Sequence, residues 1–99
     1  MGQIRELQKK CHDTAVDKGF WDTGHTRNNA EMVMLMVTEL AEAVEGLRHN
    51  DWLNVGEEFA DTVIRIMDFC EARGIDLESA IEQKMVRNKE RPYKHGKKF

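Results

Sequence analysis

The sequence predicts an all-α fold, an antiparallel bundle of about four helices in one domain that covers residues 1–99. Apolar residues recur three and four positions apart over long segments, and no segment alternates with a period of two. Short links rich in glycine, asparagine and aspartate separate these segments, which favours antiparallel neighbours. Because a chain of 99 residues buries only a modest share of its surface, we expect oligomerisation to complete the core.

The first helix is predicted over residues 3–18, and Gly19 is well placed to end it. Its apolar stripe consists of Ile4, Leu7, Cys11 and Ala15. Residues 19–28 are rich in turn-forming side chains and are predicted to form a loop. We expect the two cysteines, Cys11 and Cys70, to be buried free thiols, since they are far apart and form no CxxC motif; a disulfide is the alternative.

Two longer helices follow. One is predicted over residues 29–49; the other starts after a short link at residues 50–54 and runs to about Arg73. Asn28 or Asn29 can cap the first of them, and Gly74 fits the residue after the second. Their stripes consist of Ala30, Val33, Met34, Val37, Leu40, Ala41, Val44 and Leu47, and of Val55, Phe59, Ala60, Val63, Ile64, Ile66, Met67 and Cys70.

The fourth helix is predicted over residues 77–89, with Asp76 as its N-cap and Pro92 at or beyond its end. We expect Leu77, Ala80, Ile81 and Met85 to face inward. The net charge of −3 is divided unevenly, because residues 84–99 carry +6 and the rest of the chain carries −9. An acidic body with a basic tail over about residues 90–99 suits a metal and phosphate site; a solvated tail is the alternative.

Two carboxylate pairs lie within the apolar runs of the second and third helices. Glu39 and Glu42 are three residues apart, as are Glu58 and Asp61, so each pair projects to one side of its helix. Carboxylates beside a core are costly unless something compensates them, and a hard divalent cation does so. Surface acids on amphipathic helices are the alternative. No histidine follows a glutamate by three residues, which favours Mg²⁺ or Mn²⁺ over iron or zinc.

Other polar residues suggest how a substrate would bind. Lys84, Asn88 and Arg91 form one helical stripe of donors suited to phosphate oxygens, although basic residues at a helix end also favour its dipole. Three side chains near the first helix and loop could stack on or hydrogen-bond a base; the alternatives are a Trp in the core and a solvent-facing His. These side chains are His12, Trp21 and His25.

The chain resembles the MazG-like, all-α nucleoside triphosphate pyrophosphohydrolases from about residue 10 to residue 96. The resemblance rests on E-x-x-E followed by E-x-x-D and on the segments TELAEAVEGLR, EEFADTVIRI and KMVRNKER. It implies Mg²⁺ binding by the four carboxylates Glu39, Glu42, Glu58 and Asp61, and phosphate contacts by Lys84, Asn88 and Arg91. The W-D-x-x-H segment resembles the dCTP pyrophosphatase branch, which implies that His12 and Trp21 hold the base. Thr38 departs from the family, which often has Glu there.

The sequence and the resemblance together predict an enzyme that hydrolyses a nucleoside triphosphate to the monophosphate and pyrophosphate with Mg²⁺, in nucleotide-pool housecleaning. The four carboxylates are its expected catalytic residues, and the resemblance implies a homodimer or homotetramer. No membrane-spanning run or signal peptide is present, so we expect a cytoplasmic protein whose partner is not a nucleic-acid polymer. The alternative is a non-catalytic nucleotide-binding or helical interaction module. The preferred base, the number of ions, the general base and the oligomer size stay open.

Overall fold

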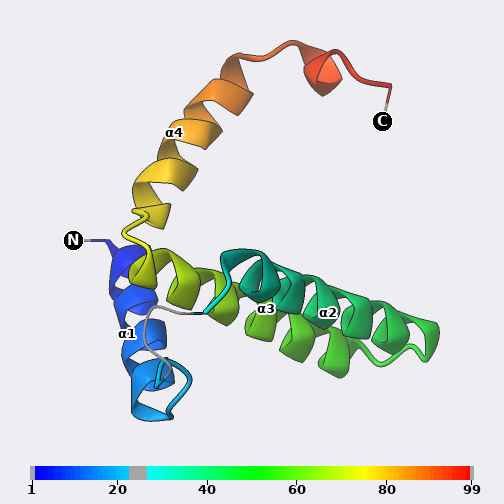
Figure 1. Ribbon diagram of the computed structural model, residues 1–99. Coiled ribbons are helices and arrows are strands. Elements are labelled where there is room, and N and C mark those ends of the chain that lie inside the picture. The colour runs from blue at the N-terminus through cyan, green and yellow to red at the C-terminus, as the bar shows by residue number, and fades with distance from the viewer. Residues whose placement is uncertain (1, 23–26, 99) are drawn as a thin grey trace.

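The computed structural model describes residues 2–22 and 27–98, and these residues form an all-helical chain (Figure 1). The elements are α1 (Gln3–Asp17), α2 (Asn29–Arg48), α3 (Trp52–Ala72), α4 (Leu77–Glu90) and the short 3₁₀ helix η2 (Tyr93–Gly96). The predicted fold class is confirmed. The third helix starts earlier than predicted, at Trp52, so residues 49–51 alone link α2 to α3.

Side-chain caps fix the starts of three helices at the points that the sequence indicated or close to them. Asn28 Oδ1 accepts a hydrogen bond from the backbone N–H of Glu31 at 3.0 Å. Asp51 and Asp76 cap α3 and α4 in the same way. Gly19 and Gly74 follow α1 and α3 with φ of +86° and +72°, a conformation that glycine adopts without steric cost. Capping chemistry therefore determines where the chain turns.

The centre of the fold is the hairpin of α2 and α3, which lie side by side, with α1 packed against the C-terminal half of α3 (Figure 1). The buried apolar side chains come mainly from this hairpin. They are Met32, Ala43, Val55, Met67 and Cys70. Gly46 approaches the α3 start so closely that a Cβ there would meet the Asn54 side chain at 2.8 Å. The hairpin thus gives a rigid frame for side chains that point between α1, α2 and α3.

Helix α4 projects away from this frame (Figure 1). It is anchored at its start, where Arg5 Nη1 pairs with Asp76 Oδ2 at 2.7 Å and the Arg5 backbone N–H donates to Glu78. The prediction that Ala80 and Met85 face inward is wrong for the single chain, since both are exposed and Met85 is 65% exposed. A short link after α3 was expected to fold α4 back onto the bundle, but the contacts that it makes are with α1.

Helix α2 carries two apolar seams that are offset by one residue. The inner seam faces α3 and α1 and includes Met32, Ala43 and Gly46, which are buried. The outer seam repeats at alternating steps of four and three residues and consists of Val33, Val37, Leu40, Val44 and Leu47. Each of these five side chains is 44–49% exposed. The wide stripe seen in the sequence is therefore only half covered within one chain.

The described residues include no helix that is both long and apolar enough to cross a lipid bilayer. Cys11 and Cys70 are both free thiols; Cys70 is buried, whereas Cys11 is only partly covered. The prediction of free thiols is confirmed, and the alternative of a disulfide is not.

Candidate functional site

Three of the four predicted carboxylates converge between α2 and α3. Glu39 on α2 and Glu58 and Asp61 on α3 each offer an oxygen, and these oxygens all lie within 4.8 Å of one another. The i, i+3 spacing places Glu58 and Asp61 on one side of α3, and the hairpin brings Glu39 opposite them. That separation puts three hard oxygen ligands within reach of one divalent cation.

Glu58 shows that this cluster carries unbalanced negative charge. A side-chain hydrogen bond with Glu42, then burial, then the charges of Glu42, Glu39 and Asp61 raise the pKa of Glu58 to about 7. Its side chain is almost fully covered, with 9% of the residue exposed. A carboxyl group held among other carboxylates favours the proton-bound form unless a cation compensates the charge. The donor set and its charge therefore fit a bound Mg²⁺ or Mn²⁺.

The fourth predicted ligand, Glu42, lies beside the cluster rather than within it. It is exposed, and its side chain is hydrogen-bonded with that of Glu58. Among the described residues, the tight group of three does not include Glu42. Thr38, which replaces the glutamate common in the resembling family, donates its hydroxyl to the Leu35 carbonyl at 2.6 Å and adds no carboxylate.

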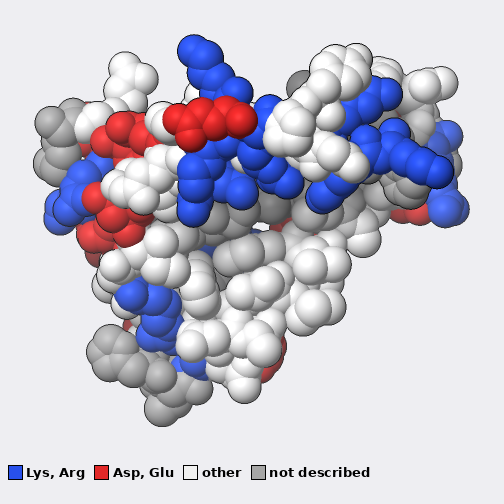
Figure 2. Space-filling view, turned by 90° about the horizontal axis from the view of Figure 1, so that it is seen from above, with Lys and Arg blue, Asp and Glu red and all other residues white. Residues whose placement is uncertain are grey.

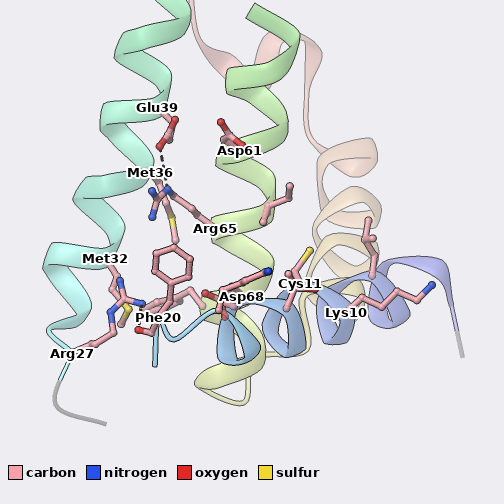
Figure 3. Close-up of a pocket in the computed structure, with 16 residues that line it drawn as sticks. Lys10, Cys11, Phe20, Arg27, Met32, Met36, Glu39, Asp61, Arg65 and Asp68 are labelled. Carbon is pink, nitrogen blue, oxygen red and sulfur yellow. Dashed lines mark hydrogen bonds and ion pairs between the residues drawn. The ribbon is translucent and has the colours of Figure 1, made fainter. Parts of the chain in front are cut away.

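A cation of the protein itself reaches the cluster from α3. Arg65 Nε donates to Glu39 Oε1 at 3.2 Å, and the side chains of Glu39 and Arg65 are 14% and 39% exposed. Arg65 lies one helical turn after Asp61, so α3 presents both residues to the same space. Figure 3 shows the guanidinium reaching from α3 toward Glu39 on α2, with Asp61 on the same helix as Arg65.

The carboxylates open into a pocket of about 510 Å³ between α1, α2 and α3 (Figure 3). Glu39, Asp61 and Arg65 line one end. The apolar lining consists of Leu7, Ala15, Phe20, Met32, Met36, Ile64 and Phe69. Lys10, Lys18 and Arg27 add positive charge. A pocket with apolar walls and a charged end suits a ligand that has a flat organic group and an anionic group.

Asp68 organises the other end of this pocket. It accepts hydrogen bonds from His12 Nδ1 at 2.8 Å and from Trp21 Nε1 at 2.9 Å. The rings of His12 and Trp21 meet edge to face, with centroids 5.5 Å apart. The two residues predicted to hold a base are thus brought together around Asp68; Asp68 lines the pocket, but neither His12 nor Trp21 does. His25, the third such residue, lies outside the described residues.

Two arginines cover the Trp21 ring. The guanidinium carbons of Arg27 and Arg73 lie 4.9 Å and 5.4 Å from its centroid. Arg73 is fixed by hydrogen bonds to Asn29 Oδ1 and to the Arg27 carbonyl. Trp21 is thus held by its indole N–H and by two cations, so in this conformation its ring is not a free stacking platform.

Cys11 also lines the pocket, but it is not suited to act as a nucleophile. Burial, and then the charge of Asp68, raise the pKa of its thiol above the ordinary value. The thiol therefore stays protonated at neutral pH, and the thiolate is the reactive form. Its contribution here is apolar surface.

The predicted phosphate-binding stripe lies elsewhere in this chain. Lys84 and Asn88 are exposed on α4, and Arg91 is exposed directly after it. The backbone of Arg91 is extended, with ψ of 155°, so the predicted helical stripe ends before Arg91, and none of the three residues lines the pocket. Figure 2 looks down on the molecule from the side of α4 and shows Lys and Arg side chains gathered on this face. The structure thus connects His12 and Trp21 to the pocket through Asp68, while it leaves Lys84, Asn88 and Arg91 apart from the pocket within one chain.

Two residues of the site were not anticipated from the sequence in these roles. Arg65 was part of the segment EEFADTVIRI but was not singled out, although its position one turn after Asp61 places it on the same face. Arg27 lies in the predicted loop, and its stacking on Trp21 depends on a loop conformation that no spacing rule gives. Helical spacing places Asp68, seven residues after Asp61, close to that face, and it is found in the pocket.

Comparisons with protein-family models, with curated proteins and with solved structures found no match for this chain.

Proposed function

We propose that the protein is a Mg²⁺-dependent hydrolase that converts a nucleoside triphosphate and water to the nucleoside monophosphate and pyrophosphate. The observation that carries this proposal is the convergence of Glu39, Glu58 and Asp61 beside an apolar-walled pocket, whose charged end Glu39 and Asp61 line. Pyrophosphate release by a MazG-like enzyme is what the resemblance in the sequence implies, and the geometry supports it. Mn²⁺ is the alternative ion.

The pocket dictates how a nucleotide would lie. Its anionic chain would reach the end lined by Glu39 and Asp61, and its base would lie among the apolar side chains toward His12 and Trp21. Glu39, Glu58 and Asp61 would hold the ion, which when bound neutralises phosphate charge and orients the attacking water. The pocket wall would exclude bulk water from the base.

The attacking water must lose a proton as its oxygen bonds to phosphorus and pyrophosphate departs. Glu42 is the carboxylate best placed to accept it, because it contacts Glu58 yet stands outside the group of three that would hold the ion. A carboxylate that is fully engaged by a cation is a weaker base. Glu42 would thus act as the general base, and it starts from an exposed position.

A second copy of the chain is part of this proposal. The outer seam of α2 is continued by Phe59 and Val63 on α3, which are 50% and 45% exposed. Two hairpins packed through these seams would form a four-helix core. Such an assembly would also allow Lys84, Asn88 and Arg91 of one chain to reach the triphosphate held by the other.

One assay tests the activity directly. Purified protein is incubated with a panel of ribo- and deoxynucleoside triphosphates, with Mg²⁺ or with EDTA, and the products are separated by ion-exchange chromatography. We expect nucleoside monophosphate and pyrophosphate in equal amounts, only with the ion. Release of inorganic phosphate with the diphosphate, or no turnover of any triphosphate, would contradict the proposal. Light scattering tests the assembly. We expect wild type to form a dimer or a larger oligomer and Leu40→Glu to be a monomer.

A further inference from the structure

Arg65 lies at the junction between the two halves of the pocket. Its guanidinium is beside the Glu39 carboxylate, at the charged end, while its own turn of α3 continues through Asp68 toward the apolar end (Figure 3). A nucleotide that spans the pocket has to pass this guanidinium. Arg65 is also the basic side chain that, among the described residues, is paired with a member of the acidic group of three.

The contact of Arg65 with Glu39 engages one of its N–H groups, Nε. A guanidinium carries five N–H donors in a planar fork that matches the oxygens of a phosphate. The acidic group would otherwise face its own negative charge, since its three carboxylates offer oxygens that lie within 4.8 Å of one another. In the ion-free protein, Arg65 therefore serves as a built-in counter-ion at the position where an external cation would act.

We propose that Arg65 is an ion-responsive phosphate-binding residue. Without a divalent ion it pairs with Glu39, and when an ion neutralises Glu39 it turns to a phosphate oxygen of the nucleotide. The ion weakens the pair because it takes Glu39 as a ligand and repels the guanidinium. This inference rests on the proposed function, and it adds a positive group from the chain's own α3 to the donors expected from α4.

A different role for Arg65 predicts an opposite result. If Arg65 only held Glu39 in the orientation that binds the ion, its removal would weaken ion binding, because supporting residues of a metal site increase affinity for the metal. If Arg65 competes with the ion, its removal strengthens ion binding. The sign of the change in ion affinity therefore separates the two roles without any measurement of turnover.

The test uses Arg65→Gln in the full-length protein, with isothermal titration of Mn²⁺ alone and of inorganic pyrophosphate in the presence of Mg²⁺. The Glu39–Arg65 pair is partly exposed, so we expect Mn²⁺ to bind about two- to fivefold more tightly. Pyrophosphate should bind roughly tenfold or more weakly, since a charge-assisted contact is lost. Unchanged or weaker Mn²⁺ binding, or unchanged pyrophosphate binding, would overturn the proposal.

Two further variants keep the result interpretable. Arg48→Gln removes an arginine that pairs with Glu45 at 3.7 Å on the exposed end of α2, and it should change neither affinity. Arg65→Lys keeps the charge but not the planar fork, so Mn²⁺ affinity should stay near that of wild type while pyrophosphate binding falls. If circular dichroism shows that Arg65→Gln does not fold, Arg65→Lys decides the matter: wild-type affinity for pyrophosphate would overturn the proposal.

The failure of this inference and that of the proposed function look different. Wild-type protein that binds no divalent ion contradicts the proposed function, and with it the role of Arg65. Wild-type protein that binds Mn²⁺ and releases pyrophosphate from triphosphates, with an Arg65→Gln variant of unchanged ion affinity, contradicts only the role of Arg65.

Discussion

The two ends of the pocket are each built around carboxylates, yet they differ in how those carboxylates are compensated. At one end, Asp68 accepts hydrogen bonds from His12 and Trp21. At the other, Glu39, Glu58 and Asp61 face one another, with Arg65 as the cation paired with Glu39. Hydrogen bonds from neighbouring donors stabilise a carboxylate, whereas neighbouring carboxylates destabilise it.

Under the proposed function, this difference separates a structural end of the pocket from a reactive end. A buried carboxylate with its donors in place fixes the side chains around it, as Asp68 fixes His12 and Trp21. A group of carboxylates without enough donors raises the free energy of the folded chain until a ligand supplies positive charge. Proteins retain such unfavourable arrangements mainly where they bind or react with something.

The largest effect is expected at the uncompensated end. Glu58→Gln removes one carboxylate from the group of three, so turnover should fall at least about a hundredfold through loss of the ion. The same change should raise the melting temperature of the ion-free protein, because the amide can donate to Glu42 and repulsion is relieved. Pyrophosphate release and thermal unfolding in EDTA measure the two effects.

Glu57→Gln is the matched control, since it removes the neighbouring exposed carboxylate on the same turn of α3. It should leave turnover within about twofold of wild type, as surface substitutions usually do. A Glu58→Gln variant with full turnover would show that the acidic group is not the reactive end of the pocket.

The next effect concerns whether a second chain completes the acidic end. Arg91→Ala should lower kcat/KM by roughly ten- to a hundredfold, because a charge-assisted phosphate contact is lost. Arg91 is exposed and α4 projects away from its own pocket, so this loss requires α4 from another copy. Lys89→Ala, on the opposite side of α4, should have little effect.

Mixing the inactive variants distinguishes contacts between chains from contacts within one. Glu58→Gln and Arg91→Ala should recover part of the wild-type activity when they are unfolded and refolded together, because a mixed dimer contains one intact site. No recovery, with dimers verified by light scattering, would place Arg91 outside the site or within its own chain's pocket.

The sequence predicted the helices well because their determinants are local. Asn28, Asp76, Gly19 and Gly74 act on the residues next to them, and each has the predicted role. The position of α4 could not be predicted in this way. Its inward face was judged from apolar spacing alone, whereas α4 projects away from the hairpin and Met85 is 65% exposed.

The candidate site was predicted in part for the same reason. Helical spacing groups Glu58 with Asp61, and a hairpin of two helices brings Glu39 to them. The pairing of Arg65 with Glu39 depends on the register between α2 and α3, which sequence spacing does not define. The placement of Arg27 over Trp21 depends on the loop conformation.

At the compensated end, Asp68→Asn should reduce stability rather than ion binding. Both donors can still meet the amide oxygen, but the negative charge of the acceptor and the contact of Trp21 Nε1 with Oδ2 at 3.2 Å are lost, at a cost of about 1–3 kcal/mol. Urea unfolding would measure this loss, and Mn²⁺ titration should show an affinity close to that of wild type. Asp13→Asn is the control, because it alters an exposed pair with Lys9 on α1. Equal stability of Asp68→Asn and wild type would remove the contrast between the two ends.

The smallest effect is a dependence of stability on pH that belongs to the acidic end alone. The pKa of Glu58 is raised from an ordinary value of 4.5 to about 7, so between these values the folded chain holds a proton that the unfolded chain releases. The contribution of this group to the free energy of unfolding therefore decreases as pH rises from about 4.5 to about 7, and changes little above that.

Melting temperatures in EDTA across this range should show the decrease in wild type and less of it in Glu58→Gln, in which the other titrating groups are retained. Added Mg²⁺ should raise the melting temperature more at pH 7.5 than at pH 5, because the ion competes with the proton for the same carboxylates. An identical pH dependence for wild type and Glu58→Gln would mean that the negative charge of the acidic group is already compensated in the ion-free protein, as the charge of Asp68 is.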